Sequence, residues 1–223
     1  MPNAILSWSG GKDSLLALER LRREGKYDVA ALLSTYNSDF GRVFMHGVRI
    51  ELLRMQAESL GLPLTEVGLG KDHTNTDYEG AMGAILEGKK GEGISAVAFG
   101  DIFLEDLRAY RTDRLARAGM EAVFPLWKED TAALARDFIA RGYKAIVTCV
   151  DGCELDEDLA GREYDGEFLK SLPSDADPCG ENGEFHTFAY DGPGFGKPVR
   201  FERGEITSKD GRFFFCDLIP KTG

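Results

Sequence analysis

The feature that most constrains the fold of this chain is the regular alternation of short apolar runs with amphipathic stretches over the first 150 residues. The apolar runs predict strands at 4–8, 29–35, 64–69, 94–99, 121–124 and 143–150. The stretches between them have apolar residues at helical spacing and predict helices at 13–24, 45–60, 78–89, 103–118 and 131–141. Strands that alternate with helices form a parallel sheet with right-handed crossovers, and fully apolar strands are buried on both faces. We therefore expect a doubly wound α/β domain over residues 1–150.

The last third of the chain has a different pattern. Residues 172–196 are rich in Pro, Gly, Asp and Glu. Alternating segments follow around 185–190, 199–206 and 212–218, with a turn signal at 209–211. This pattern is typical of antiparallel strands. Residues 151–223 are therefore expected to form a small α+β subdomain that binds the substrate.

The composition is that of an ordinary globular protein, with 43% apolar and 29% charged residues. No apolar run approaches the roughly 18 residues of a membrane span, and the N-terminus lacks the basic and apolar segments of a signal peptide. We expect a cytoplasmic protein with no membrane partner. The cysteines form no C-x-x-C pair, which disfavours a zinc site and is typical of reduced thiols; they are Cys149, Cys153, Cys179 and Cys216.

The formal net charge of −11 argues against a nucleic-acid partner, because an acidic surface repels phosphates. Four arginines nevertheless recur at helical spacing in the predicted helix 103–118: Arg108, Arg111, Arg114 and Arg117. The interpretation favoured here is a solvated helix face on which these arginines pair with Glu105 and Asp106.

A glycine-rich loop lies where the first predicted strand meets the first predicted helix, and it consists of Ser9, Gly10, Gly11, Lys12, Asp13 and Ser14. In a parallel sheet this is the carboxyl edge, where ligands bind. Two glycines let the backbone approach an anion, free N–H groups of the helix face that anion, and Lys12 adds a mobile positive charge. The loop is not a Walker A motif, which needs Ser or Thr directly after the lysine. The alternative is an ordinary glycine turn with Asp13 as the helix N-cap.

This six-residue string resembles the PP-loop of the N-type ATP pyrophosphatases. The resemblance implies an adenine nucleotide α-hydrolase-like fold and the use of ATP with Mg²⁺. It implies cleavage of ATP to AMP and pyrophosphate, with adenylation of a substrate oxygen. All six residues are then expected to bind the nucleotide, and Lys12 and Asp13 are also expected to take part in catalysis.

A second string, Asp-Pro-Cys-Gly-Glu-Asn-Gly-Glu-Phe-His-Thr at 177–187, resembles the signature of the diphthine–ammonia ligase family. The segments 100–102, 125–127 and 159–162 are similar to that family too, so the resemblance covers essentially the whole chain. It implies a ligase that adenylates a carboxylate and amidates it with ammonium. Eukaryotic members amidate diphthine on elongation factor 2.

The signature departs from those enzymes at Asn182, Phe185 and His186, and so does the segment 103–106. These departures resemble a short prokaryotic branch. In an archaeal source diphthine is the expected acceptor, whereas in a bacterial source the acceptor must be a different carboxylate. The partners expected are therefore a carboxylate-bearing substrate and ammonium, and the chain is expected to form a homodimer.

The loop 177–187 carries the groups expected to hold the substrate: Gly180, Glu181, Asn182, Gly183, Glu184, His186 and Thr187. Its carboxylates could hold Mg²⁺ through the triphosphate or bind an ammonium ion. His186 could orient the substrate carboxylate or accept a proton, and Glu184 and His186 are expected to be catalytic. The alternative is a solvated acidic turn in which Glu and Asn cap backbone groups.

Four further residues are candidates for the site. Gly100 and Asp101 end the strand 94–99 and are expected at the nucleotide, where Asp13 and Asp101 would bind Mg²⁺; the alternative for Asp101 is a helix cap. Ser34, with the residue after it, lies where the superfamily binds adenine or ribose. His46 contacts substrate or phosphate, or else merely neighbours a helix start.

Two other functions compete with the ligase. One is a PP-loop enzyme that modifies tRNA, which would want a basic surface and often paired cysteines. The other is a non-catalytic module that binds ATP or AMP. The net charge of −11 and the scattered cysteines argue against the first.

Overall fold

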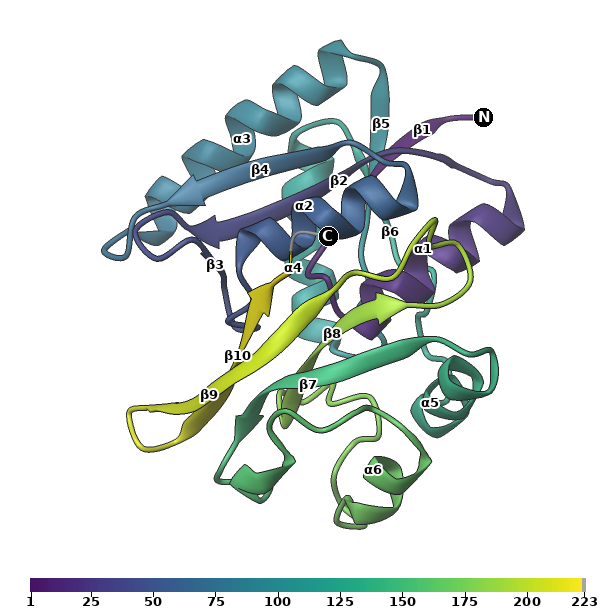
Figure 1. Ribbon diagram of the computed structural model, residues 1–223. Coiled ribbons are helices and arrows are strands. Elements are labelled where there is room, and N and C mark those ends of the chain that lie inside the picture. Colours follow the sequence, from purple (N-terminus) through teal and green to yellow (C-terminus); the bar gives the residue numbers. More distant parts are fainter. Residues whose placement is uncertain (222–223) are drawn as a thin grey trace.

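The computed structural model describes residues 1–221, which are organised by two sheets (Figure 1). The first sheet contains β1 (Asn3–Ser7), β2 (Asp28–Asn37), β3 (Arg42–Val43), β4 (Leu64–Leu69), β5 (Ile94–Ala98) and β6 (Glu121–Val123). β1 pairs in parallel with β2 on one side and β5 on the other, while β4 extends from β2 and β6 from β5. The short β3 is antiparallel to β2. The chain winds outward from β1 in both directions, which confirms the predicted parallel α/β sheet.

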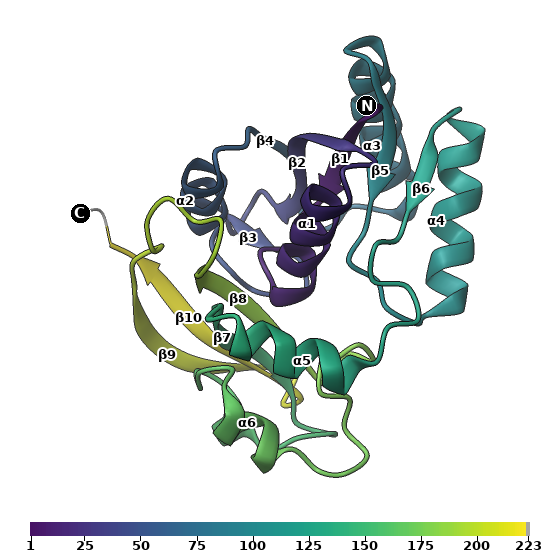
Figure 2. The ribbon, with the colours of Figure 1, turned by 90° about the vertical axis from the view of Figure 1, so that its right-hand side faces the viewer.

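Helices cover both faces of this sheet, and they are α1 (Lys12–Glu24), α2 (Ile50–Leu60), α3 (Asn75–Gly91) and α4 (Glu105–Arg117). α1 and α2 pack their apolar stripes into the larger core, which continues into the second sheet. α3 and α4 cover the other face, over a smaller core that includes Ile5, Val97 and Leu115. Figure 2 shows α1 and α4 on opposite sides of β5 and β6.

The second sheet is antiparallel and has the order β8-β7-β10-β9. Its strands are β7 (Lys144–Asp151), β8 (Phe185–Asp191), β9 (Phe201–Lys209) and β10 (Phe213–Pro220). This part is completed by α5 (Thr131–Ala140), the 3-10 turn η1 (Glu157–Leu159) and α6 (Gly166–Ser171). Phe138 of α5 and Phe168 of α6 are buried in the larger core. No helix of residues 1–221 is long and apolar enough to cross a membrane.

One strand lies in a different sheet from the one predicted. The apolar run at 143–150 was expected to join the parallel sheet, but β7 pairs antiparallel with β8 and β10. A strand buried on both faces has the same apolar pattern in either kind of sheet, so its periodicity does not assign it. The division of the chain near residue 150 stays a prediction.

Helix α2 begins at Ile50 and not at residue 45 as predicted. The backbone before it turns at Met45 and Gly47, where φ is 63° and 67°. Glycine is required at the second position, because a Cβ there would lie 2.5 Å from Cδ1 of Phe215. The turn brings His46 to the cavity described below.

Candidate active site

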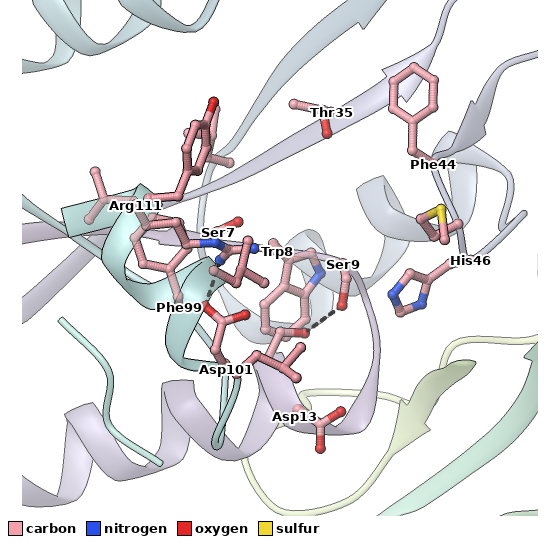
Figure 3. Close-up of a pocket in the computed structure, with 18 of the residues that line it drawn as sticks. Ser7, Trp8, Ser9, Asp13, Thr35, Phe44, His46, Phe99, Asp101 and Arg111 are labelled. Carbon is pink, nitrogen blue, oxygen red and sulfur yellow. Dashed lines mark hydrogen bonds and ion pairs between the residues drawn. The ribbon is translucent and has the colours of Figure 1, made fainter. Parts of the chain in front are cut away.

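A cavity of about 910 Å³ opens at the carboxyl edge of the first sheet, near β1 and β5. The winding direction reverses between these two strands, which is where ligands bind in doubly wound sheets. The walls come from the ends of both strands, the start of α1, residues 43–46, the facing sides of α3 and α4, and residues 179–187. In Figure 3, Asp13, Asp101 and Ser9 surround the same space, with Arg111 on one side and His46 on the other. Cavities of this size hold small-molecule ligands.

The predicted phosphate loop forms the turn from β1 into α1. Gly10 has a φ of 81°, and Gly11 is the N-cap of α1, so no side chain caps the helix. The Gly11 amide donates to Ser9 Oγ at 3.2 Å, and the Lys12 amide donates to Thr187 Oγ1 at 3.1 Å. The N-cap residue has no side chain to occupy the amides that follow Lys12, and the start of α1 borders the cavity, as an anion site requires.

Gln56 of α2 stabilises this loop through hydrogen bonds, and it was not predicted as a site residue. It is fully buried, its Oε1 accepts from Trp8 Nε1 at 2.9 Å, and its Nε2 donates to Gly10 O at 2.9 Å. The same Nε2 also donates to Ala189 O of β8. The signal that could have revealed it is a polar residue within the apolar stripe of the predicted helix 45–60.

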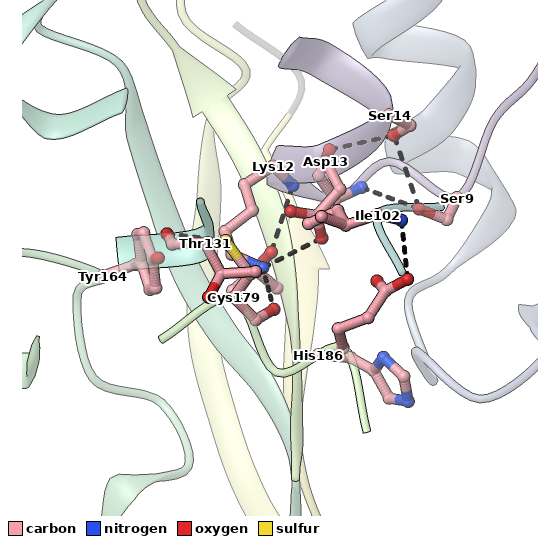
Figure 4. Close-up of polar contacts among 12 residues, drawn as sticks. Ser9, Lys12, Asp13, Ser14, Ile102, Thr131, Tyr164, Cys179 and His186 are labelled. Atoms are coloured by element: carbon pink, nitrogen blue, oxygen red, sulfur yellow. Dashed lines mark hydrogen bonds and ion pairs between the residues drawn. The ribbon is translucent and has the colours of Figure 1, made fainter. Parts of the chain in front are cut away.

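Lys12 is a fixed charge and not the mobile one predicted. Its side chain is 2% exposed, and Nζ lies 2.9 Å from Asp13 Oδ2 and donates to Cys179 O. The ring centroids of Tyr164 and Phe185 lie 5.3 and 5.2 Å from the same nitrogen. Figure 4 shows the Lys12 side chain with its contacts to Asp13 and Cys179. Burial lowers the pKa of Lys12, but Asp13, Cys179 and Glu181 together raise it by more, so the net shift is upward. Lys12 therefore ties the phosphate loop to the loop 177–187.

Three carboxylates converge at the floor of the cavity, from Asp13, Asp101 and Glu181. Glu181 Oε1 accepts from the amides of Ile102 at 2.7 Å and Phe103 at 3.3 Å. Burial, helped by the charges of Asp13 and Asp101, raises the pKa of Glu181 to about 7 against the pull of those amides. Burial and the charge of Asp13 also raise the pKa of Asp101.

These carboxylates fit a cation that arrives with a ligand. Oδ1 of Asp13 and Oδ2 of Asp101 are buried without an aligned hydrogen bond, although Arg111 lies 2.9 Å from the latter as an ion pair. Within residues 1–221, no group of three or more His, Cys, Asp or Glu side chains forms a ready metal cage. Mg²⁺ commonly binds through one or two carboxylates plus substrate phosphates, so the residues fit that mode.

Glu184 faces the inside of the loop 177–187 and not the cavity. It is 4% exposed, and its Oε1 accepts from the Asp177 amide and from Asn182 Nδ2, both at 2.9 Å. Asp177 in turn accepts from the Cys179 amide at 2.7 Å. The structure therefore places the Glu184 carboxylate within the loop that carries Glu181 and His186, and a catalytic role for Glu184 stays a prediction.

The rings of His46 and His186 pack against each other at a tilt of 31°, with centroids 4.5 Å apart. His46 Nδ1 lies 3.2 Å from Thr187 O, and a carbonyl can only accept, so Nδ1 carries the proton. Burial lowers the pKa of His46 to about 4, and burial together with His46 lowers that of His186. Both rings are neutral at pH 7. They are suited to hydrogen bonding and not to taking up a proton.

Ser34 does not line the cavity. It is 1% exposed and its hydroxyl donates to Trp8 O. Thr35, the next residue of β2, points the other way and lines the cavity. Of the two, Thr35 is the residue placed to meet a ligand.

The arginines of α4 do not pair as predicted with Glu105 and Asp106. Arg111 reaches Asp101 at 2.9 Å, Arg114 reaches Glu79 of α3 at 2.7 Å, and Arg117 reaches Asp113. The helix face is turned toward the cavity and toward α3 and not only toward solvent, which sequence spacing does not reveal.

Comparison with known proteins identifies the family. The model for the diphthamide synthase N-terminal domain matches residues 1–122, and the model for its C-terminal domain matches 130–217. The chain belongs to the diphthamide synthase family. A protein of Danio rerio named diphthine–ammonia ligase is 27% identical over 222 residues, which covers 88% of this chain and 85% of that protein. The Mus musculus protein of the same name is 29% identical, with 88% and 82% covered.

These findings confirm the family predicted from residues 9–14 and 177–187, the ATP-dependent ligase class and the use of ATP. A longer Schizosaccharomyces pombe protein named diphthine–ammonia ligase is 25% identical, and 89% of this chain covers 36% of it. The comparisons give no support to the tRNA-modifying or non-catalytic alternatives. The roles of the individual site residues stay predictions.

Proposed function

We propose that this member of the diphthamide synthase family adenylates a substrate carboxylate with ATP and then amidates it with ammonia in the cavity at the start of α1. One observation carries the proposal: Lys12 donates to both Thr187 and Cys179, so the phosphate loop and the loop 177–187 face one cavity as a unit. A ligase of this kind needs a nucleotide and an acid in one place. The acceptor is diphthine on elongation factor 2 in a source that makes it, and another carboxylic acid elsewhere.

The first step joins a carboxylate oxygen to the α-phosphorus, and the bond from that phosphorus to the bridging oxygen breaks to release pyrophosphate. The first-turn amides of α1 and the hydroxyls of Ser9 and Ser14 orient the phosphates. Lys12 fixes the loop in that shape. Asp13 and Asp101 would hold Mg²⁺, which supplies charge neutralisation at the phosphates when bound.

The second step needs ammonia in place of ammonium, because only the free lone pair attacks the acyl carbon as AMP leaves. Glu181 is the group suited to take the proton, since burial raises its pKa to about 7. The neutral rings of His46 and His186 can accept hydrogen bonds from the nitrogen nucleophile. On forming the amide the nitrogen loses a second proton to solvent, so acyl-adenylate and ammonia yield the amide, AMP and one proton.

The test is acid-dependent formation of AMP from ATP, measured with and without ammonium across a panel of carboxylic acids and a diphthine-bearing elongation factor. The informative variant is Asp101→Asn, matched to Asp106→Asn, an exposed residue on the first turn of α4. We expect Asp101→Asn to lower the rate on the order of a hundredfold and Asp106→Asn to leave it unchanged. Formation of ADP in place of AMP, or equal rates in both variants, contradicts the proposal.

Three finer expectations stay predictions: the Mg²⁺ requirement, the cytoplasmic location and the homodimer. Magnesium is the one tied to named residues, and removal of divalent cations with a chelator is expected to abolish AMP formation by the wild-type chain.

A further inference from the structure

Gln56 is a polar side chain within the apolar face of α2. It is fully buried, and leucines one turn before and one turn after it belong to the larger core. A polar group in such a place costs free energy unless its hydrogen bonds are made. Gln56 makes them: Oε1 accepts from Trp8 Nε1, and Nε2 donates to the carbonyls of Gly10 and Ala189. Because the indole N–H can only donate, Oε1 must face Trp8 and Nε2 must face the two carbonyls.

Through these bonds Gln56 holds the peptide that joins the two glycines of the phosphate loop. Gly10 O accepts from Gln56 Nε2 at 2.9 Å and from the Ala189 amide at 2.8 Å, so both of its lone pairs are used. In a trans peptide the carbonyl and the N–H that follows it point in opposite directions. The Gly11 amide is therefore turned away from Gln56, and it donates to Ser9 Oγ at 3.2 Å.

A peptide between two glycines turns over more easily than any other. Gly10 has a φ of 81°, and neither residue has a Cβ to oppose the rotation. A reversed peptide would direct the Gly10 carbonyl, an acceptor, to the side where the Gly11 amide now donates. The hydrogen bonds from Gln56 and Ala189 oppose this reversal, because it would leave buried donors without a partner.

Ser9 carries the effect of this peptide into the cavity. Ser9 and Ser14 both line the cavity, and their hydroxyl oxygens lie 3.4 Å apart (Figure 4). Ser14 donates to Gly11 O at 2.9 Å, and Ser9 Oγ accepts from the Gly11 amide. The proton of the Ser9 hydroxyl is then free to be donated to Ser14 or to a phosphate oxygen in the cavity. A reversed peptide would remove the amide that orients Ser9.

We infer that Gln56 is a positioning residue for the nucleotide, which holds the Gly10–Gly11 peptide in the orientation that lets the phosphate loop donate to phosphates. Gln56 itself lies behind the loop and does not line the cavity. This role rests on the proposed function, which places the phosphates of ATP at residues 9–14. Packing of α2 alone would require only an apolar side chain of the same size at this position.

Gln56→Met tests the inference, because it keeps a side chain of similar length and removes both donors. Its control is Ser59→Ala on the same helix. Ser59 is 8% exposed and exchanges hydrogen bonds with the backbone of Lys197, so its bonds do not involve the phosphate loop. Both variants lose buried hydrogen bonds, and urea denaturation measures the stability that each loses. Calorimetry at a temperature where all three chains are folded measures the binding of pyrophosphate and ATP.

We expect Gln56→Met to bind both ligands on the order of tenfold more weakly than the wild type, and Ser59→Ala to bind them unchanged. The amide signal of Gly11, followed by NMR as pyrophosphate is added, gives a readout that also works in the wild type alone. Donation from Ser9 to a phosphate oxygen strengthens the hydrogen bond that Ser9 Oγ accepts from Gly11. The Gly11 amide proton is therefore expected to shift downfield in the wild type and not in Gln56→Met.

Three results overturn the role of Gln56 and leave the proposed ligase intact. They are equal affinities in the wild type and Gln56→Met, an equal loss of affinity in both variants, or a Gly11 signal that stays in place in the wild type saturated with pyrophosphate. If the wild type binds neither pyrophosphate nor ATP, the proposed function fails and the role of Gln56 fails with it.

Discussion

At the scale of single residues, the site is governed by the cost of burying charge. Asp13, Asp101 and Glu181 lie together with limited access to water, and burial raises the pKa of each; Asp13 raises that of Asp101 further, and both raise that of Glu181. Lys12 and Arg111 offset part of that cost. The site is therefore short of positive charge until a cation or ammonium arrives.

Glu181→Gln tests this account through the pH dependence of stability. The native carboxyl keeps its proton up to about pH 7, whereas the unfolded one loses it near the usual glutamate pKa of 4.5. Between these values the native state binds more protons, so the free energy of unfolding of the wild type falls as pH rises. The glutamine side chain does not titrate, so it contributes no pH dependence to the free energy of unfolding. Its oxygen can still accept hydrogen bonds from the amides of Ile102 and Phe103.

We therefore expect Glu181→Gln to gain stability relative to the wild type as pH rises from 4.5 to 7, and no further above it. Urea denaturation over pH 4 to 8 measures the difference. A difference that does not change with pH would show that Glu181 ionises as freely in the native state as in the unfolded chain. Asp106→Asn, on the exposed first turn of α4, serves as the control.

At the scale of elements, the site depends on the close approach of the end of β5 to the start of α1. A Cβ on Gly100 would lie 3.0 Å from both Asp13 C and Ser14 N. These are backbone atoms that cannot rotate away. The glycine is thus required for its lack of a side chain, and it sets the spacing between the phosphate loop and Asp101.

Gly100→Ala is expected to destabilise the chain by about 1–3 kcal/mol through overpacking and to weaken ATP binding. The matched control is Gly88→Ala, since a Cβ there meets nothing within 4 Å. That change in a helix interior should stabilise by up to about 1 kcal/mol. Urea denaturation and calorimetry with ATP report the two effects. Unaltered ATP binding in a folded Gly100→Ala variant would argue against a nucleotide at this junction.

At the scale of the whole molecule, contacts between the two sheets complete the site. The Ala189 amide of β8 donates to Gly10 O at 2.8 Å, and Asp217 of β10 accepts from Arg42 at 2.9 Å and from Arg49 at 2.7 Å. The second sheet therefore fixes both the phosphate loop and the turn that carries His46. We expect neither sheet to form the site alone.

Asp217→Asn measures this connection. Hydrogen bonds from Arg49 and Arg42 lower the pKa of Asp217 to about 2, against its usual 3.8. A depressed pKa gives stability that is present above the unfolded value and lost as pH falls through the folded one. The loss on substitution is expected to be about 1–2 kcal/mol at pH 6 and to shrink between pH 4 and pH 2.

The matched control is Glu66→Gln, which breaks the more exposed pair with Arg54 and should cost less than about 1 kcal/mol. Urea denaturation at each pH gives both values. An Asp217→Asn loss that persists undiminished at pH 2 would mean that the charge of this carboxylate is not what joins the sheets.

The sequence by itself determined the parallel sheet, the glycine-rich turn between its first strand and first helix, and the family. Apolar runs and helical stripes report which segments are buried, and the strings at 9–14 and 177–187 are local enough to be recognised without a fold. Only the tertiary structure decided the partner of β7, the direction of Ser34 and Glu184, and the fixed position of Lys12. It also revealed the contact of Gln56 with the backbone of Gly10. The physical reason is that periodicity records how deeply a residue is buried, whereas which atoms it meets depends on segments far away in the chain.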